Sequence, residues 1–225
     1  MRAFIHENRY VLLILAIFAY TVIYLYRFQR KQAFDREFQY LLQKGTPEEC
    51  RKHLQSPAGK KIYHEYELKI RELDSDLHFD RRKEARELIQ ELLSTPMKER
   101  DFIAFHNKAL NFAVQEKDPE IAEQVCSAFS KYKRHAKYAT EARQVTDIYL
   151  YRKADYIDKL TASSQKTGKP SVKATAYYRI ARQYYYLKDM ENCRRYLEMA
   201  YTVFPDKTWR KLIDELLKGD YAQFA

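Results

Sequence analysis

The sequence predicts an all-α protein, and three observations support this fold class. The 225 residues include only 4 glycines and 6 prolines, which leaves long stretches uninterrupted. Apolar residues recur at helical spacing between charged residues, which make up 32% of the chain. A spacing of about 36 residues relates the small or apolar residues Ala181, Val145 and Ala109. We therefore expect an N-terminal apolar helix followed by a stack of helix hairpins, an α-solenoid.

The N-terminal element is the uncharged segment from Tyr10 to Tyr26, which lies between Arg9 and Arg27. A helix of this length, at about 1.5 Å per residue, reaches roughly 25 Å, close to the minimum that crosses a bilayer. Its aromatic ends and flanking arginines suit the membrane interface. The other interpretation is a cleaved signal peptide, but the apolar run is long and no Ala-x-Ala site follows it. We expect residues 1–27 to be a retained transmembrane anchor in the lipid bilayer.

The orientation of this anchor follows from the basic residues on either side of it. Before the segment lie Arg2 and Arg9, and after it lie Arg27, Arg30, Lys31 and Arg36. Basic residues are enriched on the cytoplasmic side of membrane proteins. We therefore expect a single-pass membrane protein whose soluble domain lies in the cytoplasm.

Residues 28–45 continue the helical pattern as an amphipathic stem. Its apolar positions are Phe34, Phe38, Leu41 and Leu42. The first glycine of the chain, Gly45, ends this pattern, and Thr46 followed by Pro47 has the form of a helix N-cap. We expect the soluble repeat domain to begin here and to occupy residues 46–225.

The strongest local pattern covers residues 174–205, which form two amphipathic segments joined by a tight turn at Lys188 and Asp189. The expected core residues are Tyr177, Ile180, Ala181, Tyr184, Cys193, Leu197 and Ala200, with Pro205 closing the second helix. The small residues Ala181 and Cys193 allow two helices to cross closely. This pattern resembles the tetratricopeptide repeat (TPR), with Tyr, Ala and Cys replacing its Trp, Gly and first Ala. The resemblance implies a TPR-like hairpin that needs neighbours to bury its apolar face.

Three further hairpins are expected from the same spacing. They pair residues 61–75 with 81–93, residues 101–115 with 119–131, and residues 137–152 with 154–162. A last amphipathic helix over 207–217 would cap the open end of the stack.

The resemblance also implies a concave binding face, formed by the first helix of each hairpin. The expected groove residues are Tyr178, Arg182, Tyr185, Tyr186, Tyr149, Thr146, His106 and Leu110. Tyrosine and arginine are common hot-spot residues at interfaces. We expect a Tyr-rich groove that binds a partner protein or peptide, so that the protein serves as a membrane-anchored scaffold or adaptor, for example in membrane-protein assembly or secretion. The alternative is that several of these tyrosines only pack against the next helix.

The net charge of +10 suits an anionic neighbour such as a membrane surface, an acidic protein or RNA. The segment Lys131 to Lys137 (KYKRHAK) places basic residues beside tyrosines, which suggests an alternative function, a basic membrane-associated protein that binds RNA. Such a run is more often a solvated connection, so the sequence favours a protein partner over a nucleic acid.

Neither catalysis nor a cofactor is indicated. The three cysteines, Cys50, Cys126 and Cys193, have neither disulfide-framework nor zinc-site spacing. The six histidines form no H-E-x-x-H motif, and the chain contains no Gly-rich phosphate loop and no G-x-S-x-G motif. We therefore expect no enzyme activity, no cofactor and no metal site.

Overall fold

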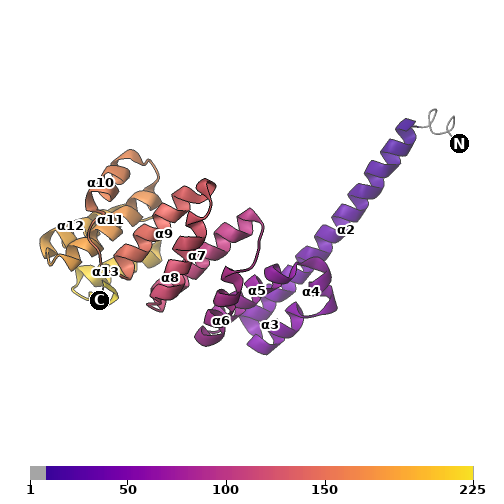
Figure 1. The fold of residues 1–225 in the computed structure, drawn as a ribbon, viewed down its shortest axis with the longest axis horizontal. Coiled ribbons are helices and arrows are strands. Elements are labelled where there is room, and N and C mark those ends of the chain that lie inside the picture. The colour runs from indigo at the N-terminus through magenta and orange to yellow at the C-terminus, as the bar shows by residue number, and fades with distance from the viewer. Residues whose placement is uncertain (1–8, 225) are drawn as a thin grey trace. The chain divides into compact units, whose positions relative to one another are not determined.

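A computed structural model describes residues 9–224 of the protein, except the side chains of residues 9–12 and 16. Within this range all regular secondary structure is helical (Figure 1), so the predicted all-α class is confirmed. The chain divides into two compact units, Met1–Met97 and Lys98–Ala225.

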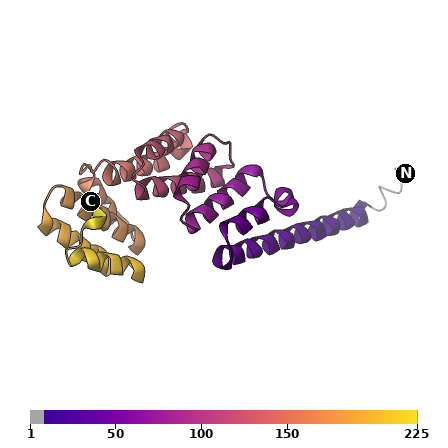
Figure 2. The same cartoon turned by 90° about the horizontal axis from the view of Figure 1, so that it is seen from below.

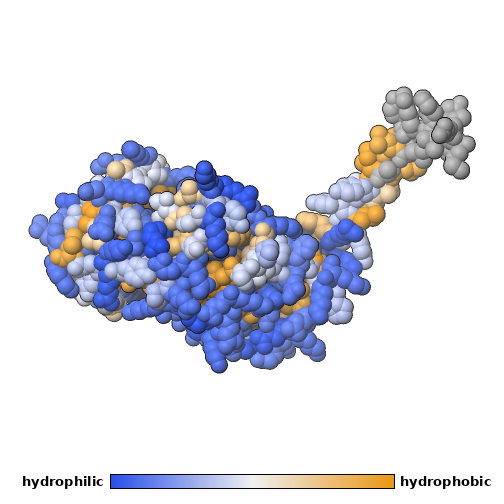
Figure 3. Space-filling view, viewed as in Figure 1, coloured by the Kyte–Doolittle hydropathy of each residue, from blue (hydrophilic) through white to orange (hydrophobic). Residues whose placement is uncertain are grey.

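The first unit begins with α2 (Arg9–Lys44), a single helix of 36 residues that merges the expected apolar segment and stem (Figure 2). Large apolar side chains from Leu13 to Phe28 are exposed along it, and Figure 3 shows apolar surface on the N-terminal part of this helix. Residues 1–8 of the expected anchor lie outside the described residues. In the part of the chain that the structure describes, no helix combines the length and the apolar character needed to cross a membrane.

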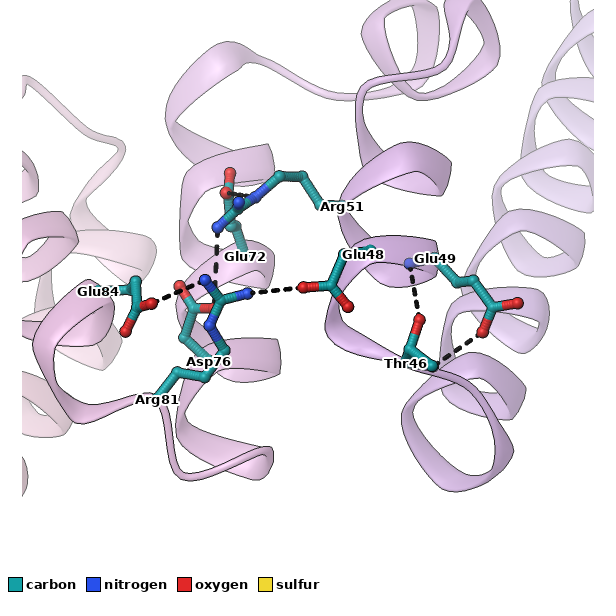
Figure 4. Close-up of polar contacts among 8 residues, drawn as sticks. All are labelled: Thr46, Glu48, Glu49, Arg51, Glu72, Asp76, Arg81 and Glu84. Atoms are coloured by element: carbon teal, nitrogen blue, oxygen red, sulfur yellow. Dashed lines mark hydrogen bonds and ion pairs between the residues drawn. The ribbon is translucent and has the colours of Figure 1, made fainter.

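Two short helices, α3 (Pro47–Leu54) and α4 (Pro57–Ile62), pack against the C-terminal half of α2. Thr46 caps α3 in a capping box, in which its hydroxyl accepts from the Glu49 N–H at 3.2 Å and its own N–H donates to the Glu49 carboxylate at 2.8 Å (Figure 4). Phe34 and Phe38 of α2 are buried here with residues of the two short helices. Because the stem is part of this core, the compact unit continues through Gly45 and ends only after Met97.

A polar network joins α3 to the hairpin of α5 (Glu65–His78) and α6 (Arg82–Leu93) (Figure 4). At its centre the Asp76 carboxylate is 2% exposed, and its Oδ1 lies 3.7 Å from Arg81 Nε and 4.0 Å from Arg51 Nη2. Arg51 also donates to Glu72 at 2.6 Å, and Arg81 donates to Glu84 at 2.8 Å. Burial raises the pKa of Asp76, although the two arginines oppose this rise. The network therefore holds α3 to the α5–α6 hairpin, although its central carboxylate is costly to bury.

The second unit consists of helices that pack mainly on their neighbours in sequence. In order these are α7 (Glu99–Gln115), α8 (Pro119–Ser130), the 3₁₀ turn η1 (Lys133–His135), α9 (Ala136–Tyr149), α10 (Ile157–Lys166), α11 (Pro170–Tyr186), α12 (Met190–Val203), α13 (Lys207–Leu217) and the 3₁₀ turn η2 (Ala222–Phe224). The pairs α7–α8 and α11–α12 are the expected hairpins. The expected α9–α10 hairpin is wrong, because α10 packs on α11 while α9 packs on α8 and α7.

The turns that follow the first helix of each predicted pair all contain a left-handed residue. Each contains a residue other than glycine with a left-handed φ between 53° and 62°, and these residues are Asp80, Lys117, Arg152 and Lys188. In three of the four turns, the next backbone N–H donates to the carbonyl oxygen five residues earlier, at 2.8 to 3.0 Å, as in a Schellman helix end. The turn at Arg152 differs, since the Lys153 N–H reaches back six residues to Asp147 at 2.9 Å. The spacing predicted from apolar residues is thus also a spacing of turns.

Candidate partner-binding site

One face of α11 forms the hairpin core with α12. The small or aliphatic residues of this core have no exposed surface, and they are Ile180, Ala181, Cys193, Leu197 and Ala200. Tyr177 is buried and Tyr184 is half-buried, and both rings contact Tyr196, at centroid distances of 6.0 and 5.6 Å. Pro205 is exposed and follows the end of α12 at Val203. The residues of α11 that resemble the TPR pattern therefore face α12.

The opposite face of α11, where a groove was expected, is covered by the chain's own C-terminal segment. The Tyr178 ring meets Trp209 of α13 and Phe224 of η2 edge-on, at centroid distances of 5.8 and 5.4 Å. Tyr185 stacks on Tyr221 at 5.2 Å and contacts Phe224 at 5.5 Å. Phe224 has no exposed surface. The expectation of an open Tyr-rich groove along this face is therefore corrected, because an aromatic side chain of the same protein fills it.

Arg182 lies at the edge of this aromatic cluster. Its guanidinium carbon lies 4.5 Å from the ring centroid of Tyr149, 5.2 Å from that of Phe224 and 5.9 Å from that of Tyr186. Its Nε also donates a hydrogen bond to the Tyr186 hydroxyl. Burial raises the pKa of the Tyr186 hydroxyl, while the positive charge of Arg182 opposes that rise. Arg182 thus links α9, α11 and η2 through cation–π contacts.

Beside Arg182 is a cavity of about 550 Å³. Its aromatic walls come from Tyr149, Tyr151, Tyr178 and Trp209, and its cations are Lys117, Arg152 and Arg182. Among the described residues that line it, none is acidic. Aromatic surface next to three cations, with no acidic residue among the described lining residues, suits a segment that carries an acidic side chain beside an apolar or aromatic one.

Three predicted groove residues lie elsewhere, in the buried core of the second unit. Thr146 has no exposed surface, and its hydroxyl donates to the Ala142 carbonyl at 2.9 Å. His106 is 1% exposed with its Nδ1 2.8 Å from the Phe102 carbonyl oxygen, and burial lowers its pKa to about 4. Leu110 is 5% exposed. These positions are buried because α7, α8 and α9 pack together, so they do not contribute to the cavity.

The two cations at the turns and the C-terminal segment were not predicted from the sequence as parts of the site. Lys117 and Arg152 are left-handed turn residues, and Arg152 lies 36 residues before Lys188 while Lys117 lies 35 residues before Arg152. Trp209 lies in the helix over 207–217, which was expected only to cap the end of the stack. The burial of Phe224 had no sequence signal, because a single aromatic residue after a polar turn carries no periodicity.

Comparisons of this chain with protein-family models, with curated proteins and with solved structures find no match. Among the described residues, no group of three or more His, Cys, Asp or Glu side chains is placed to hold a metal ion. The fold and the site define the chain as an all-helical protein whose second unit carries a cationic, aromatic cavity.

Proposed function

We propose that this protein is a membrane-anchored scaffold that captures a partner protein with its second unit. The observation that carries the proposal is the cavity beside Arg182, where three cations and four aromatic rings meet without an acidic residue among the described lining residues. A partner segment with an aspartate or glutamate next to an aromatic residue would satisfy both features. The aromatic rings would bury apolar area, and the cations would select against basic competitors.

The TPR-like character of the second unit is part of this proposal. Its support is local: small residues lie at the α11–α12 crossing, and turns with a left-handed residue recur at the spacing typical of helical repeats. Repeat proteins present binding surfaces along successive helices, and here the cavity gathers residues from several of them.

The membrane anchor is the second part of the proposal. Its support is the uncharged sequence from Tyr10 to Tyr26 and the exposed large apolar side chains between Leu13 and Phe28. Such side chains are costly to expose to water and stable in hydrocarbon. The excess of basic residues after this segment favours a cytoplasmic second unit.

A crosslinking experiment tests partner capture. Tyr151 lines the cavity and is 42% exposed, so a photoreactive phenylalanine derivative at this position would react with a bound segment. In intact membranes it should crosslink to one protein, whereas the same group at Tyr201, 39% exposed and outside the cavity lining, should not. Peptides from the crosslinked region should then bind the purified protein, and replacing their acidic residues by amides should weaken binding at least tenfold.

Two outcomes would contradict the proposal. Equal crosslinking from both positions would indicate random contact. Recovery of RNA in place of a protein, with binding that weakens steeply as salt rises, would favour the alternative of a basic RNA-binding protein.

A further inference from the structure

A second cavity, of about 900 Å³, lies on the first unit where the apolar part of α2 ends. Its cations are Arg27, Arg30, Lys31 and Lys61, and its aromatic residues include Tyr24 and Tyr26. Among the described residues that line it, none carries a negative charge. This groove plays no part in the partner site described above, which belongs to the second unit.

The groove results from the packing of α4 against α2. Phe34 and Phe38 mark the face of α2 that is buried against the short helices. Residues three and four apart share a helix face, so this face continues toward the N-terminus as Lys31 and Arg27. The contact between α2 and α4 adds Lys61 to the same groove. Cations that are separated in the sequence are thus brought together by the fold.

Asp35, the carboxylate that follows on α2, does not neutralise the cations of the groove. Asp35 instead interacts with two residues outside the groove: its Oδ1 lies 3.0 Å from Arg71 Nη2 and accepts a hydrogen bond from the Tyr63 hydroxyl. Lys31 instead lies over the Tyr63 ring, with its Nζ 4.9 Å from the centroid, and Arg30 lies 5.8 Å from the centroid of Tyr26. Contacts with ring faces orient these cations without neutralising them.

The order of residues along α2 matches the order of layers in a bilayer. After Arg9, exposed apolar side chains come first, a ladder of rings at Tyr20, Tyr24 and Phe28 follows at centroid distances of 6.5 and 6.3 Å, and the next cations along the helix begin at Arg27. Aromatic rings favour the interface between hydrocarbon and headgroups, and basic residues just beyond it attract anionic lipid. We propose that this groove binds the phosphate of an anionic phospholipid headgroup while the lipid remains in the bilayer. The inference rests on the membrane placement proposed above.

The test is a competition between two vesicle populations for the full-length protein, one of phosphatidylcholine and one of equimolar phosphatidylcholine and phosphatidylserine. The parent should prefer the anionic vesicles by about tenfold or more in flotation. The variant Arg27→Gln, Arg30→Gln, Lys31→Gln and Lys61→Gln should lose this preference and still float with neutral vesicles. A matched variant, Lys166→Gln, Lys169→Gln, Lys207→Gln and Lys211→Gln, removes the same charge from exposed positions of the second unit and should keep the preference.

Several results would overturn the inference. The first is an unchanged preference in the groove variant, and the second is an equal loss in the matched variant, which would show an effect of net charge alone. The third is abolition of the preference by inorganic phosphate at constant ionic strength, which would assign the groove to a soluble anion. Failure of the parent to float with neutral vesicles would instead contradict the inserted anchor, and a groove-dependent preference for anionic vesicles would then still support the headgroup site.

Discussion

The guanidinium of Arg182 lies over the ring of Tyr149, 4.5 Å from the ring centroid, and so joins α11 to α9. Two other rings, those of Phe224 and Tyr186, complete its surroundings. A residue that the sequence suggested as an exposed groove cation is therefore half-buried and holds three elements together. Its substitution should affect stability as well as binding.

We expect Arg182→Glu to destabilise the second unit by about 1–3 kcal/mol, because it replaces a cation by a carboxylate against three electron-rich ring faces. Arg182→Lys, which keeps the charge, should cost less. Thermal melting of both variants measures the difference. Equal melting temperatures for the parent and Arg182→Glu would mean that the ring contacts contribute nothing to stability.

Binding should be separable from stability at the two turn cations. Lys117→Glu and Arg152→Glu are expected to weaken capture of an acidic partner peptide about tenfold each, which corresponds to about 1.4 kcal/mol. Lys188→Glu is the matched control, since Lys188 has the same left-handed backbone and the same exposure class but does not line the cavity. Titration of one fluorescent peptide into all three variants gives the comparison. A similar loss in the control would assign the effect to net charge.

Close packing at the α11–α12 crossing predicts a size limit at Ala181. This residue has no exposed surface, so Ala181→Leu adds atoms to a filled contact and should cost about 1–3 kcal/mol. Ala162→Leu provides the control, because Ala162 lies exposed on α10. Urea denaturation of both variants measures the free energies of unfolding. Equal midpoints would mean that the crossing has room for a larger side chain.

Acidification should destabilise the second unit through His106. Burial lowers its folded-state pKa to about 4, below the usual 6.5, and the neighbouring His135 and Lys131 act in the same direction, while the hydrogen bond to the Phe102 carbonyl oxygen opposes them. The unfolded chain therefore binds a proton between pH 6.5 and 4 that the folded chain does not. The contribution of the neutral His106 side chain to the free energy of unfolding is fully present above pH 6.5. It is lost as the pH falls toward 4, and the loss reaches at most about 3 kcal/mol.

The measurement compares the parent with His106→Leu at several pH values. The variant should gain stability relative to the parent as the pH falls, because it has no imidazole to protonate. A difference that stays constant from pH 7 to 4 would contradict a buried, neutral His106.

The helices and several of their ends follow directly from sequence. The capping box at Thr46 and the proline after Asp118 mark helix starts, because caps depend on residues next to each other in the chain. The α11–α12 hairpin was also predictable, since the small residues at its crossing lie within a short stretch of the sequence. These features share one property, which is that the interacting residues are close in sequence.

The candidate site was harder to predict because it depends on what covers each helix face. Helical spacing correctly placed Tyr184 and Tyr178 on different faces of α11. Only the fold shows that Phe224 occupies the face that carries Tyr178. Tyrosine suits both a core and a binding surface, so its position in the sequence does not distinguish the two. The packing of α10 on α11 instead of on α9 was not predicted for the same reason. The seven residues between α9 and α10 allow α10 to pack against either helix.

The left-handed turns have a consequence for how this sequence can change over time. A residue other than glycine in this conformation costs about 1 kcal/mol of stability. A glycine lowers stability by nearly as much, because it raises the conformational entropy of the unfolded chain. The two effects almost cancel, so selection has little reason to fix glycine at Asp80, Lys117, Arg152 or Lys188. Hydrogen bonds between backbone atoms hold these turns whatever the side chain. Hairpins joined by such turns are free to diverge in sequence while their backbone geometry persists, and the turn side chains become available for new positions, as the cavity-lining Lys117 and Arg152 illustrate.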